Sequence, residues 1–468
     1  KHQKKVMRRR RVVAAALLAS SRGGSVNVLP ERLFHEGNNT YDWPAARERM
    51  QAALEASLEN TTRASAETAL REALADRAHV AWIRDGKLYV DKEFLGTMKP
   101  ELHLRLMRAV LKNAKRLGET KTEARVGSGL SVYSLESSAS GSRRCKEALP
   151  VLVIAKKFAS QCGVLFPNPY FENVYAQWRK DFERLRSLAE KRTWTKRNAR
   201  VFWRGAIRGH PENDCARDAG NFARIAACAL THKHPTLFDV RATACTARRR
   251  HDCDEEYGVD SIESRVVSSC HGVLGSFVAH AKFADYQFVL DLPGSTTGSY
   301  SRNLNHLWLL GAVVLIWTGP HLDSAGASQW YTAALQSGHT HVVVNRSTAA
   351  LVSEALHSPS QEKRRNSLLA NARAVADELL CPDCIVRYVV KVLDAIRRHL
   401  PTLRDLLNAP PGSDAARQRR RLLYEDGACK RLRLVQVVGD SPRRRRAESW
   451  EVSTKPIPKS PCDLLDLR

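Results

Sequence analysis

The stretch from Lys282 to Trp317 alternates between apolar and polar segments in a way that predicts a strand, a loop, a helix and a second strand. The first apolar run, Phe288–Leu292, is short and bounded by turn residues, as expected of a buried strand. Apolar positions at helical spacing from Arg302 to Leu310 predict a helix that ends at Gly311, and Ala312–Trp317 reads as the next strand. This order of elements is typical of a parallel sheet.

The flanking sequence shows the same mixture of helical patterns and short apolar runs. Predicted helices cover 172–191, 329–335, 347–379 and 385–399, and the sequence from 30 to 117 is largely helical apart from a β-segment at 85–90. Predicted strands cover 127–135, 149–154 and 339–344, and a short aromatic strand precedes Arg204. The pattern therefore predicts an α/β protein. Residues 401–468 are rich in Pro, Gly, Arg and Asp and are expected to be disordered.

The loop between the first strand and the predicted helix carries chemistry suited to an anion. It contains small hydroxyl residues, among them Ser299 and Ser301, and ends on Arg302 at the expected helix N-terminus. Free backbone N–H groups, the helix dipole and a guanidinium would converge there, which favours a phosphate. The alternative is a simple serine cap with Arg302 in solvent.

A second candidate is the pair Arg204 and Gly205, which follows the aromatic strand. An Arg at the carboxyl end of a parallel strand, beside a Gly that lets a ligand approach, points into the crevice where α/β proteins bind ligands. An ordinary surface Arg after an edge strand is the alternative reading.

Composition and charge narrow the choice of function class. The chain has 468 residues and a formal net charge of +26, and much of the excess lies at its two ends, which indicates solvated tails rather than a nucleic-acid surface. Residues 1–29 combine a basic start with a short apolar run, which predicts a signal peptide or a short membrane anchor. Three N-glycosylation sequons, at Asn38, Asn60 and Asn345, also favour the secretory route.

The 11 cysteines are scattered except for Cys381 and Cys384, whose spacing suits either a metal or a redox pair. No second pair of ligand type accompanies them, so we expect no metal site.

Taken in order, Trp203–Ala206, the Lys282–Trp317 unit, Trp330–Tyr331 with His341 after it, and Leu380–Tyr388 resemble the Rumi-like glycosyltransferases. This is the capsule-associated-protein (CAP) family, glycosyltransferase family 90, which includes protein O-glucosyltransferases and xylosyltransferases. The resemblance covers about residues 150 to 400.

The resemblance implies a GT-B fold, with two Rossmann-like domains that face a cleft. On this basis a helical region and the acceptor-side domain occupy 30–200, and the donor domain and closing helices occupy 201–400. It also implies an inverting reaction that moves glucose or xylose from a UDP-sugar to a hydroxyl of a protein or glycan, in the lumen of the endoplasmic reticulum or Golgi. No cofactor is expected beyond the UDP-sugar co-substrate, and no nucleic acid partner.

The residues agree with a metal-free reaction, because the loop holds no pair of carboxylates for a divalent cation. Arg204, Arg302, the hydroxyls and the helix N-terminus would then neutralise the diphosphate. By the resemblance Arg204, Gly205, Ser299, Ser301 and Arg302 bind the donor.

Two positions depart from the family pattern. Where the family has an Asp that acts as general base, this chain reads Leu130–Ser137, and Glu136 is the only nearby carboxylate and so the candidate base. Gln329 stands where the family tends to have a Glu that could hold the donor ribose. These departures keep a second hypothesis open, in which the chain is a diverged GT-B pseudoenzyme that acts as a binding module.

Overall fold

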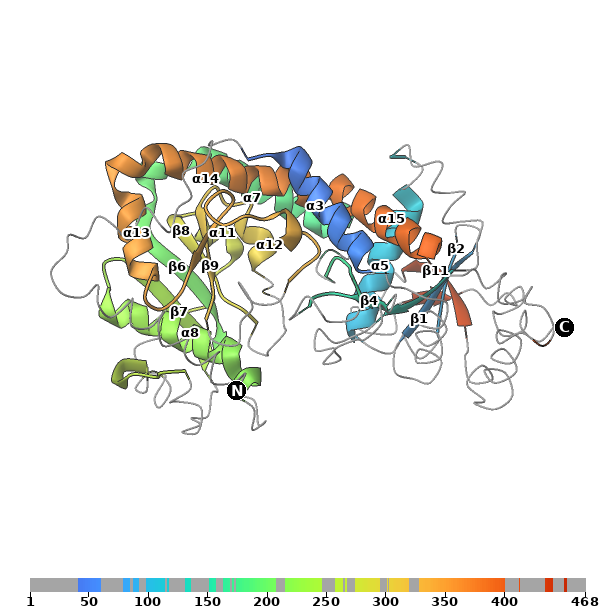
Figure 1. The fold of residues 1–468 in the computed structure, drawn as a ribbon, viewed down its shortest axis with the longest axis horizontal. Helices are drawn as coiled ribbons and strands as arrows, with labels where there is room; N and C mark the ends of the chain where they lie inside the picture. The colour runs from blue at the N-terminus through green and yellow to red at the C-terminus, as the bar shows by residue number, and fades with distance from the viewer. Residues whose placement is uncertain are drawn as a thin grey trace, which may run out of the picture. The chain divides into compact units, whose positions relative to one another are not determined.

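The computed structural model describes a mixed α/β protein with two sheets (Figure 1). Its described residues are 41–59, 79–84, 87–91, 98–113, 116–117, 131–135, 151–156, 163–168, 171, 174–207, 215–245, 257–263, 266, 274–294, 301, 303–319, 328–399, 412, 434–440 and 450–452. Residues 1–29, for which the sequence predicts a signal peptide or anchor, lie outside them.

The first sheet is mixed and has the strand order β12-β11-β2-β1-β3-β4-β5. Its strands are β1 (His79–Arg84), β2 (Lys87–Asp91), β3 (Ser131–Leu135), β4 (Val151–Val153), β5 (Val164–Leu165), β11 (Leu434–Asp440) and β12 (Trp450–Val452). Only the β3-β4 and β4-β5 pairs are parallel, whereas β1, β2, β11 and β12 pair antiparallel. Four of the six strand pairs described in this sheet therefore depart from the Rossmann-like pattern that the resemblance implied.

The prediction that 401–468 is disordered is wrong for two segments. Leu434–Asp440 forms β11, which pairs with β2, and Trp450–Val452 forms β12. The reason is visible in the sequence, because Leu434-Val-Gln-Val-Val is an apolar run of strand type inside an otherwise polar tail. The unpaired edge of the β1-β2 hairpin gives it a partner.

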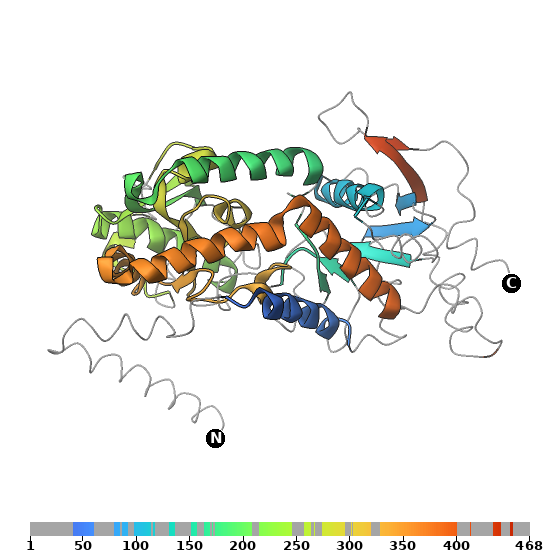
Figure 2. The same ribbon diagram turned by 90° about the horizontal axis from the view of Figure 1, so that it is seen from above.

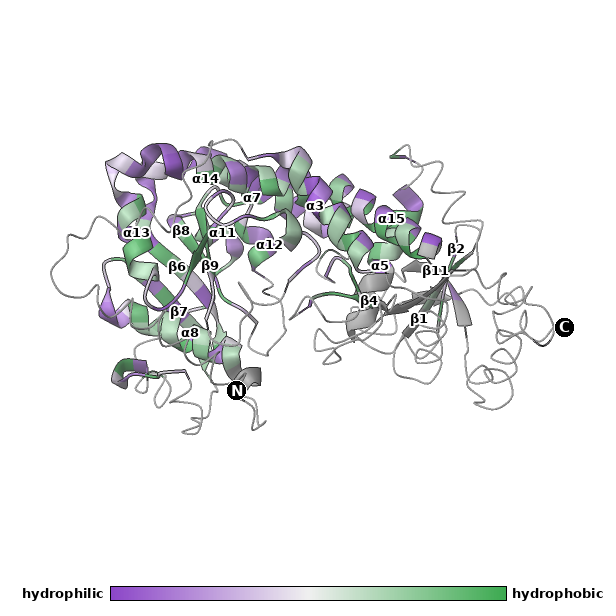
Figure 3. Ribbon diagram, viewed as in Figure 1, coloured by the Kyte–Doolittle hydropathy of each residue, from purple (hydrophilic) through white to green (hydrophobic). Residues whose placement is uncertain are grey.

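The second sheet is entirely parallel and has the order β10-β9-β8-β6-β7. Its strands are β6 (Asn198–Ile207), β7 (Phe238–Cys245), β8 (Tyr286–Asp291), β9 (Val313–Trp317) and β10 (Val342–Val344). Every residue of β8 and β9 is buried. Strands covered on both faces read as continuous apolar runs, which is why the sequence located these two closely. The hydrophobic colouring of β8 and β9 in Figure 3 follows the same pattern.

The helices are more interrupted than the sequence predicted. They are α3 (Trp43–Ala56), α5 (Met98–Asn113), α7 (Arg179–Lys191), α8 (Cys215–Lys233), α11 (His280–Phe283), α12 (Leu304–Leu307), α13 (Ala349–His357), α14 (Glu362–Val375) and α15 (Pro382–His399), with π-helical turns η5 (Val174–Trp178) and η9 (Ala376–Leu380) and 3-10 turns η6 (Trp194–Lys196), η7 (Thr332–Ala334) and η8 (Pro359–Gln361). Pro359 divides the predicted 347–379 helix, because a proline lacks the N–H that a continuous helix needs. Figure 2 shows α14, η9 and α15 as a long run with a bend.

Candidate active site

The order of the parallel strands identifies the edge of the sheet where a ligand is expected. β6 is the first strand of this sheet in the sequence, yet it lies between β7 and β8. The chain therefore adds β7 on one side of β6 and then crosses over to add β8 on the other side. In open parallel sheets such a switch point opens a crevice at the carboxyl ends of the strands, and ligands bind there. The carboxyl ends of β6 and β8, at Ile207 and Asp291, therefore define the candidate site.

Arg204 lies in β6, and its guanidinium is held by the neighbouring strand. Nη2 donates to Asp239 Oδ1 at 2.8 Å, and Nη1 donates to the carbonyl oxygens of Asp239 at 2.7 Å and Trp203 at 2.9 Å. The side chain is 11% exposed and lies over the ring of Phe202. Nε is buried and has no hydrogen-bond partner among the described residues. Most of the donor capacity of Arg204 is thus committed within the protein.

Asp239 is the centre of a basic cluster that the sequence analysis did not find. Besides Arg204, its carboxylate accepts from Tyr286 Oη at 2.8 Å and Arg241 Nε at 3.2 Å, and Arg200 lies 3.9 Å away. Burial alone would raise the pKa of Asp239, but the hydrogen bonds from Tyr286 and Arg204 hold it below its usual value. One carboxylate among three guanidinium groups leaves net positive charge beside β6 and β7.

Gly205 has a packing role in addition to its predicted one. A Cβ at this position would lie 2.4 Å from the Trp203 ring, so a larger residue could not keep the indole where it is. The space beside the Gly205 α-carbon holds an indole rather than open room for a ligand. Its assignment as a donor-binding residue stays a prediction.

The loop after β8 differs from the sequence prediction in its helix. The predicted helix 302–310 is helical only over Leu304–Leu307, and turns follow to Leu310. The helix is therefore shorter than predicted, and the anion site expected at its start stays a prediction. Ser299 and Arg302 lie outside the described residues, and their assignment as donor-binding residues stays a prediction.

Ser301 is described, and it contacts a carboxylate that the sequence analysis overlooked. Its side chain hydrogen-bonds Asp291, the last residue of β8, which is 4% exposed. Asp291 Oδ1 has no hydrogen-bond partner among the described residues. Burial raises the pKa of Asp291 to about 7, against the smaller opposing effects of Ser301 and Arg224. An acid within the apolar Phe288–Leu292 run was a signal that sequence reasoning could have used.

Asn303 links the start of α12 to β6 and to a histidine pair. Its Nδ2 donates to Arg204 O at 3.4 Å, and its Oδ1 lies 3.2 Å from His280 Nε2. The His280 ring stacks on His306 with centroids 3.9 Å apart. Burial lowers the pKa of His280 below its usual value. The two predicted motifs, around Arg204 and around Ser301, are therefore brought together by the fold.

Arg224 of α8 joins the ends of the two central strands. Its Nε and Nη2 donate to Pro293 O at 3.0 and 2.7 Å, and its Nη1 donates to Ala206 O. Pro293 follows β8 and Ala206 lies near the end of β6, so this single side chain fixes the spacing of the switch point.

A pocket of about 250 Å³ lies at the carboxyl ends of β9 and β10, beside α8. Its lining, which we call the α8 pocket, is Ala219, Phe222, Ala223, Ala226, Tyr257, Trp317, Thr318, Gly319, Asn345, Arg346 and Ser347. Phe222 and Tyr257 stack with centroids 4.0 Å apart, and Arg346 is fixed by Glu263 at 2.6 Å. Trp317 follows Ile316, the residue that pairs with Asp291, so the pocket lies at the end of the strand next to β8.

Gln329 has hydrogen-bond partners that do not belong to the switch-point edge of the parallel sheet. It is 2% exposed, and its Oε1 accepts from Asn168 Nδ2 at 3.0 Å. Its backbone N donates to Thr332 Oγ1. The predicted role, a bond to the donor ribose, would have to be performed by this buried side chain, and it stays a prediction. Glu136, the candidate base, lies outside the described residues.

Cys381 and Cys384 form a disulfide, so the pair is not a zinc site in this structure. Within the described ranges, no three His, Cys, Asp or Glu side chains gather as metal ligands do. Among the described helices, none combines the length and apolar character that crossing a membrane requires.

Comparison with known proteins identifies no family. No protein-family model matches the chain, and no curated protein matches its sequence. Among solved structures, the crystal structure of Anabaena HepE in complex with UDP and glucose is similar at a TM-score of 0.30 and 13% identity, over 60% of this chain and 67% of that one. The fold and the candidate site therefore stand on the geometry described above.

Proposed function

We propose that this chain is a UDP-sugar-dependent glycosyltransferase that transfers glucose or xylose to a hydroxyl of a protein or glycan, without a metal and with inversion. The observation that carries the proposal is the neighbouring position of β6 and β8 at the switch point, since these two strands bear the motifs that resemble family 90. The GT-B arrangement and a site of action in the endoplasmic reticulum or Golgi are parts of the same proposal.

The base of the donor would occupy the α8 pocket. Its lining combines apolar side chains, an aromatic pair that could contact a planar ring, and the polar residues Thr318, Asn345 and Ser347. The pocket lies at the end of β9, the strand next to β8, so a bound nucleotide would extend its diphosphate toward Gly294 and Ser301.

The charges at the end of β8 are compatible with a diphosphate. An ionised Asp291 would repel the ligand, but its raised pKa of about 7 keeps much of it protonated at neutral pH. Arg302 would supply the positive charge, and the cluster of Arg200, Arg204 and Arg241 adds positive potential beside β6.

The first experiment measures UDP binding by calorimetry on the purified chain. Ala223→Trp fills the α8 pocket and is expected to weaken UDP binding about 100-fold or more, because the base loses its space. Arg302→Ala is expected to abolish measurable binding. The matched control is His232→Trp, an exposed position near the end of the same helix, which should bind like the wild type. Unchanged affinity in Ala223→Trp and Arg302→Ala would refute the donor site.

The second experiment measures sugar transfer and the slower hydrolysis of UDP-glucose and UDP-xylose. Glu136→Gln is expected to lower kcat by about 100-fold or more while UDP binding stays unchanged, because the amide cannot accept the acceptor proton. Full activity in this variant would place the base elsewhere.

The alternative, a pseudoenzyme that binds without catalysing, is favoured by two observations. The guanidinium of Arg204 is engaged by Asp239, and Gln329 is engaged by Asn168, so two predicted donor contacts are already used. UDP binding without any turnover of either sugar donor would support this alternative. Measurable transfer would eliminate it.

A further inference from the structure

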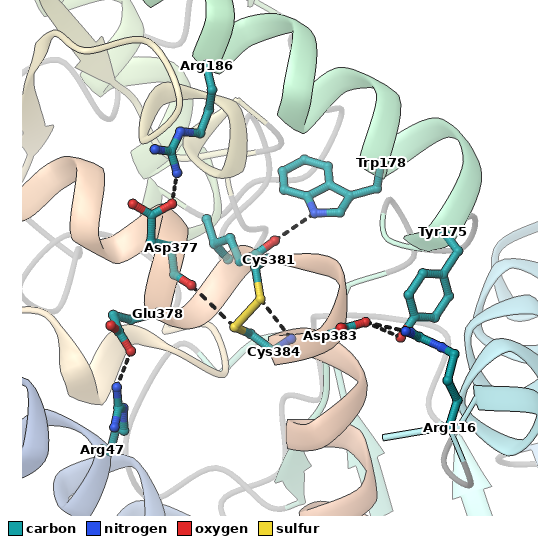
Figure 4. Close-up of a disulfide and its surroundings, with 11 residues drawn as sticks. Arg47, Arg116, Tyr175, Trp178, Arg186, Asp377, Glu378, Cys381, Asp383 and Cys384 are labelled. Carbon is teal, nitrogen blue, oxygen red and sulfur yellow. Dashed lines mark hydrogen bonds and ion pairs between the residues drawn. A yellow bond between two sulfur atoms is a disulfide. The ribbon is translucent and has the colours of Figure 1, made fainter. Parts of the chain in front are cut away.

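The disulfide between Cys381 and Cys384 stands at the joint between η9 and α15 (Figure 4). Cys381 has an extended backbone (φ −60°, ψ 147°), ends η9 and directly precedes the first residue of α15, Pro382. It therefore occupies the N-cap position of an 18-residue helix, with a proline at the position that tolerates it best. Both cysteines are partly exposed.

Each sulfur lies next to a backbone group that could hydrogen-bond it after reduction of the disulfide. The backbone N of Cys384 donates to Cys381 Sγ at 3.0 Å, as an N–H of the first helical turn does to a capping oxygen. Cys384 Sγ lies 3.3 Å from Asp377 O. A disulfide sulfur carries no hydrogen and cannot donate, so this second contact becomes a hydrogen bond only when Cys384 is a thiol.

The two sulfurs would therefore differ after reduction. The N–H of Cys384 and the positive end of the α15 dipole favour a thiolate at Cys381. The carbonyl of Asp377 favours a protonated thiol at Cys384, since only the protonated form can donate to it. A stabilised thiolate is a good leaving group in thiol–disulfide exchange.

The charge next to the pair does not oppose this asymmetry. Asp383 lies between the two cysteines, but its carboxylate is paired with Arg116 Nη2 at 2.8 Å and accepts from Tyr175 Oη at 2.7 Å. Its negative charge is thus largely offset by contacts from outside the helix.

The surrounding joint is held by contacts that do not depend on the disulfide. Asp377 pairs with Arg186, Glu378 pairs with Arg47, and Trp178 Nε1 donates to Leu380 O at 2.8 Å. The bond itself closes a loop with a sequence separation of only 3, and so short a loop restrains the unfolded chain little. We therefore expect the bond to open without loss of the fold.

We propose that Cys381 and Cys384 form a reversible thiol–disulfide exchange site that reacts with small thiols of the glutathione class. The thiolate of one reductant molecule attacks Cys384 Sγ, the bond to Cys381 breaks, and Cys381 leaves as the thiolate. A second reductant thiolate then attacks the reductant sulfur of the mixed disulfide. This step releases the oxidised reductant, and Cys384 takes up a proton and donates to Asp377 O. Two reductant thiols are oxidised and one protein disulfide is reduced. This site does not depend on the proposed transferase activity.

The first test uses the full, folded chain in mixtures of reduced and oxidised glutathione. After an acid quench and alkylation, the peptide Ala374–Arg387 that trypsin releases holds these two cysteines and no other. We expect this peptide to gain two alkyl groups as the mixture becomes more reducing and to lose them when the mixture is reversed, with circular dichroism unchanged. A bond that stays closed until the chain unfolds, or opens only with loss of the fold, would overturn the proposal.

The second test compares two variants, each of which keeps one cysteine of the pair. In Cys384→Ser, the alkylation rate of Cys381 should reach half its plateau below the pH of about 8.5 typical of a free cysteine. In the matched variant Cys381→Ser, Cys384 should react about ten-fold more slowly at pH 7, because it lacks the capping N–H. Equal rates and equal pH profiles in the two variants would contradict the assigned roles, even if both variants fold.

Discussion

In the parallel sheet a buried ionisable side chain lies at the carboxyl end of a strand, and in the mixed sheet another lies just beyond one. The first is an acid and the second is a base. Asp291 ends β8 and is 4% exposed, and burial raises its pKa to about 7. Lys156 follows β4 and is 8% exposed, and burial lowers its pKa to about 8. Each group is shifted toward its neutral form, as desolvation requires.

The difference between the two lies in what surrounds them. One oxygen of Asp291 has no hydrogen-bond partner among the described residues, and its side chain accepts from Ser301. Lys156 is enclosed by ordinary contacts, since its backbone bridges Ser328 and its Nζ lies 3.4 Å from Ser57 Oγ. The comparison teaches that burial shifts both groups toward their neutral forms, and that unsatisfied hydrogen-bonding capacity distinguishes the aspartate. Burial of the charged lysine destabilises the fold, whereas the aspartate is a candidate functional group.

The largest expected effect tests the packing of the parallel sheet. Phe288 in β8 is fully buried, and its ring lies 5.5 Å from that of Trp194 and 4.7 Å from that of His357. Phe288→Ala is expected to lower the free energy of unfolding by about 3 to 5 kcal/mol, measured by guanidinium denaturation. Leu88→Ala in β2 is the control from the mixed sheet, and it should cost less because a smaller side chain is removed. A larger loss in the control would reverse this ranking of the two sheets.

The next effect concerns Asp291 and the pH dependence of stability. The unfolded carboxyl loses its proton near pH 3.8 and the folded one near 7, so between these values only the folded state holds the proton and stability falls as pH rises. From pH 5 to pH 8 the wild type should lose about 2 to 3 kcal/mol that Asp291→Asn does not lose. Urea unfolding at both pH values measures this, and parallel behaviour of the two proteins would show that Asp291 titrates normally.

The smallest effect concerns Lys156, for which the sign is opposite. The folded amine loses its proton near pH 8 and the unfolded one near 10.5, so stability rises with pH across that window. From pH 7 to pH 9.5 the wild type should gain about 1 to 2 kcal/mol relative to Lys156→Met. The Met variant should also be the more stable of the two at pH 7. UDP binding should be unchanged by it, whereas a loss of UDP binding would give Lys156 a place in the donor site.

The parallel sheet was more predictable from sequence than the mixed sheet, and burial is the reason. Strands β8 and β9 are covered on both faces, so their sequences are largely apolar, with Gln287 and Asp291 of β8 as exceptions. The missed strand β1 and the distant β11 belong to antiparallel pairs, whose partners are set by contacts far apart in sequence. Local pattern cannot reveal such a pairing.

The candidate site also has features that the sequence determines and features that only the tertiary structure determines. Its sequence fixes which chemical groups are available: Arg204 near the end of β6, the hydroxyl-rich loop after β8, and an acid within a buried strand. It also determines the parallel character of the strands that carry them. Only the tertiary structure decides which of these groups are already used. Arg204 is bound to Asp239 and Gln329 to Asn168, because these partners come from other elements and satisfy groups that burial would otherwise leave unpaired. Asp291, in contrast, keeps one oxygen without a hydrogen-bond partner among the described residues, because packing rather than local sequence sets its surroundings.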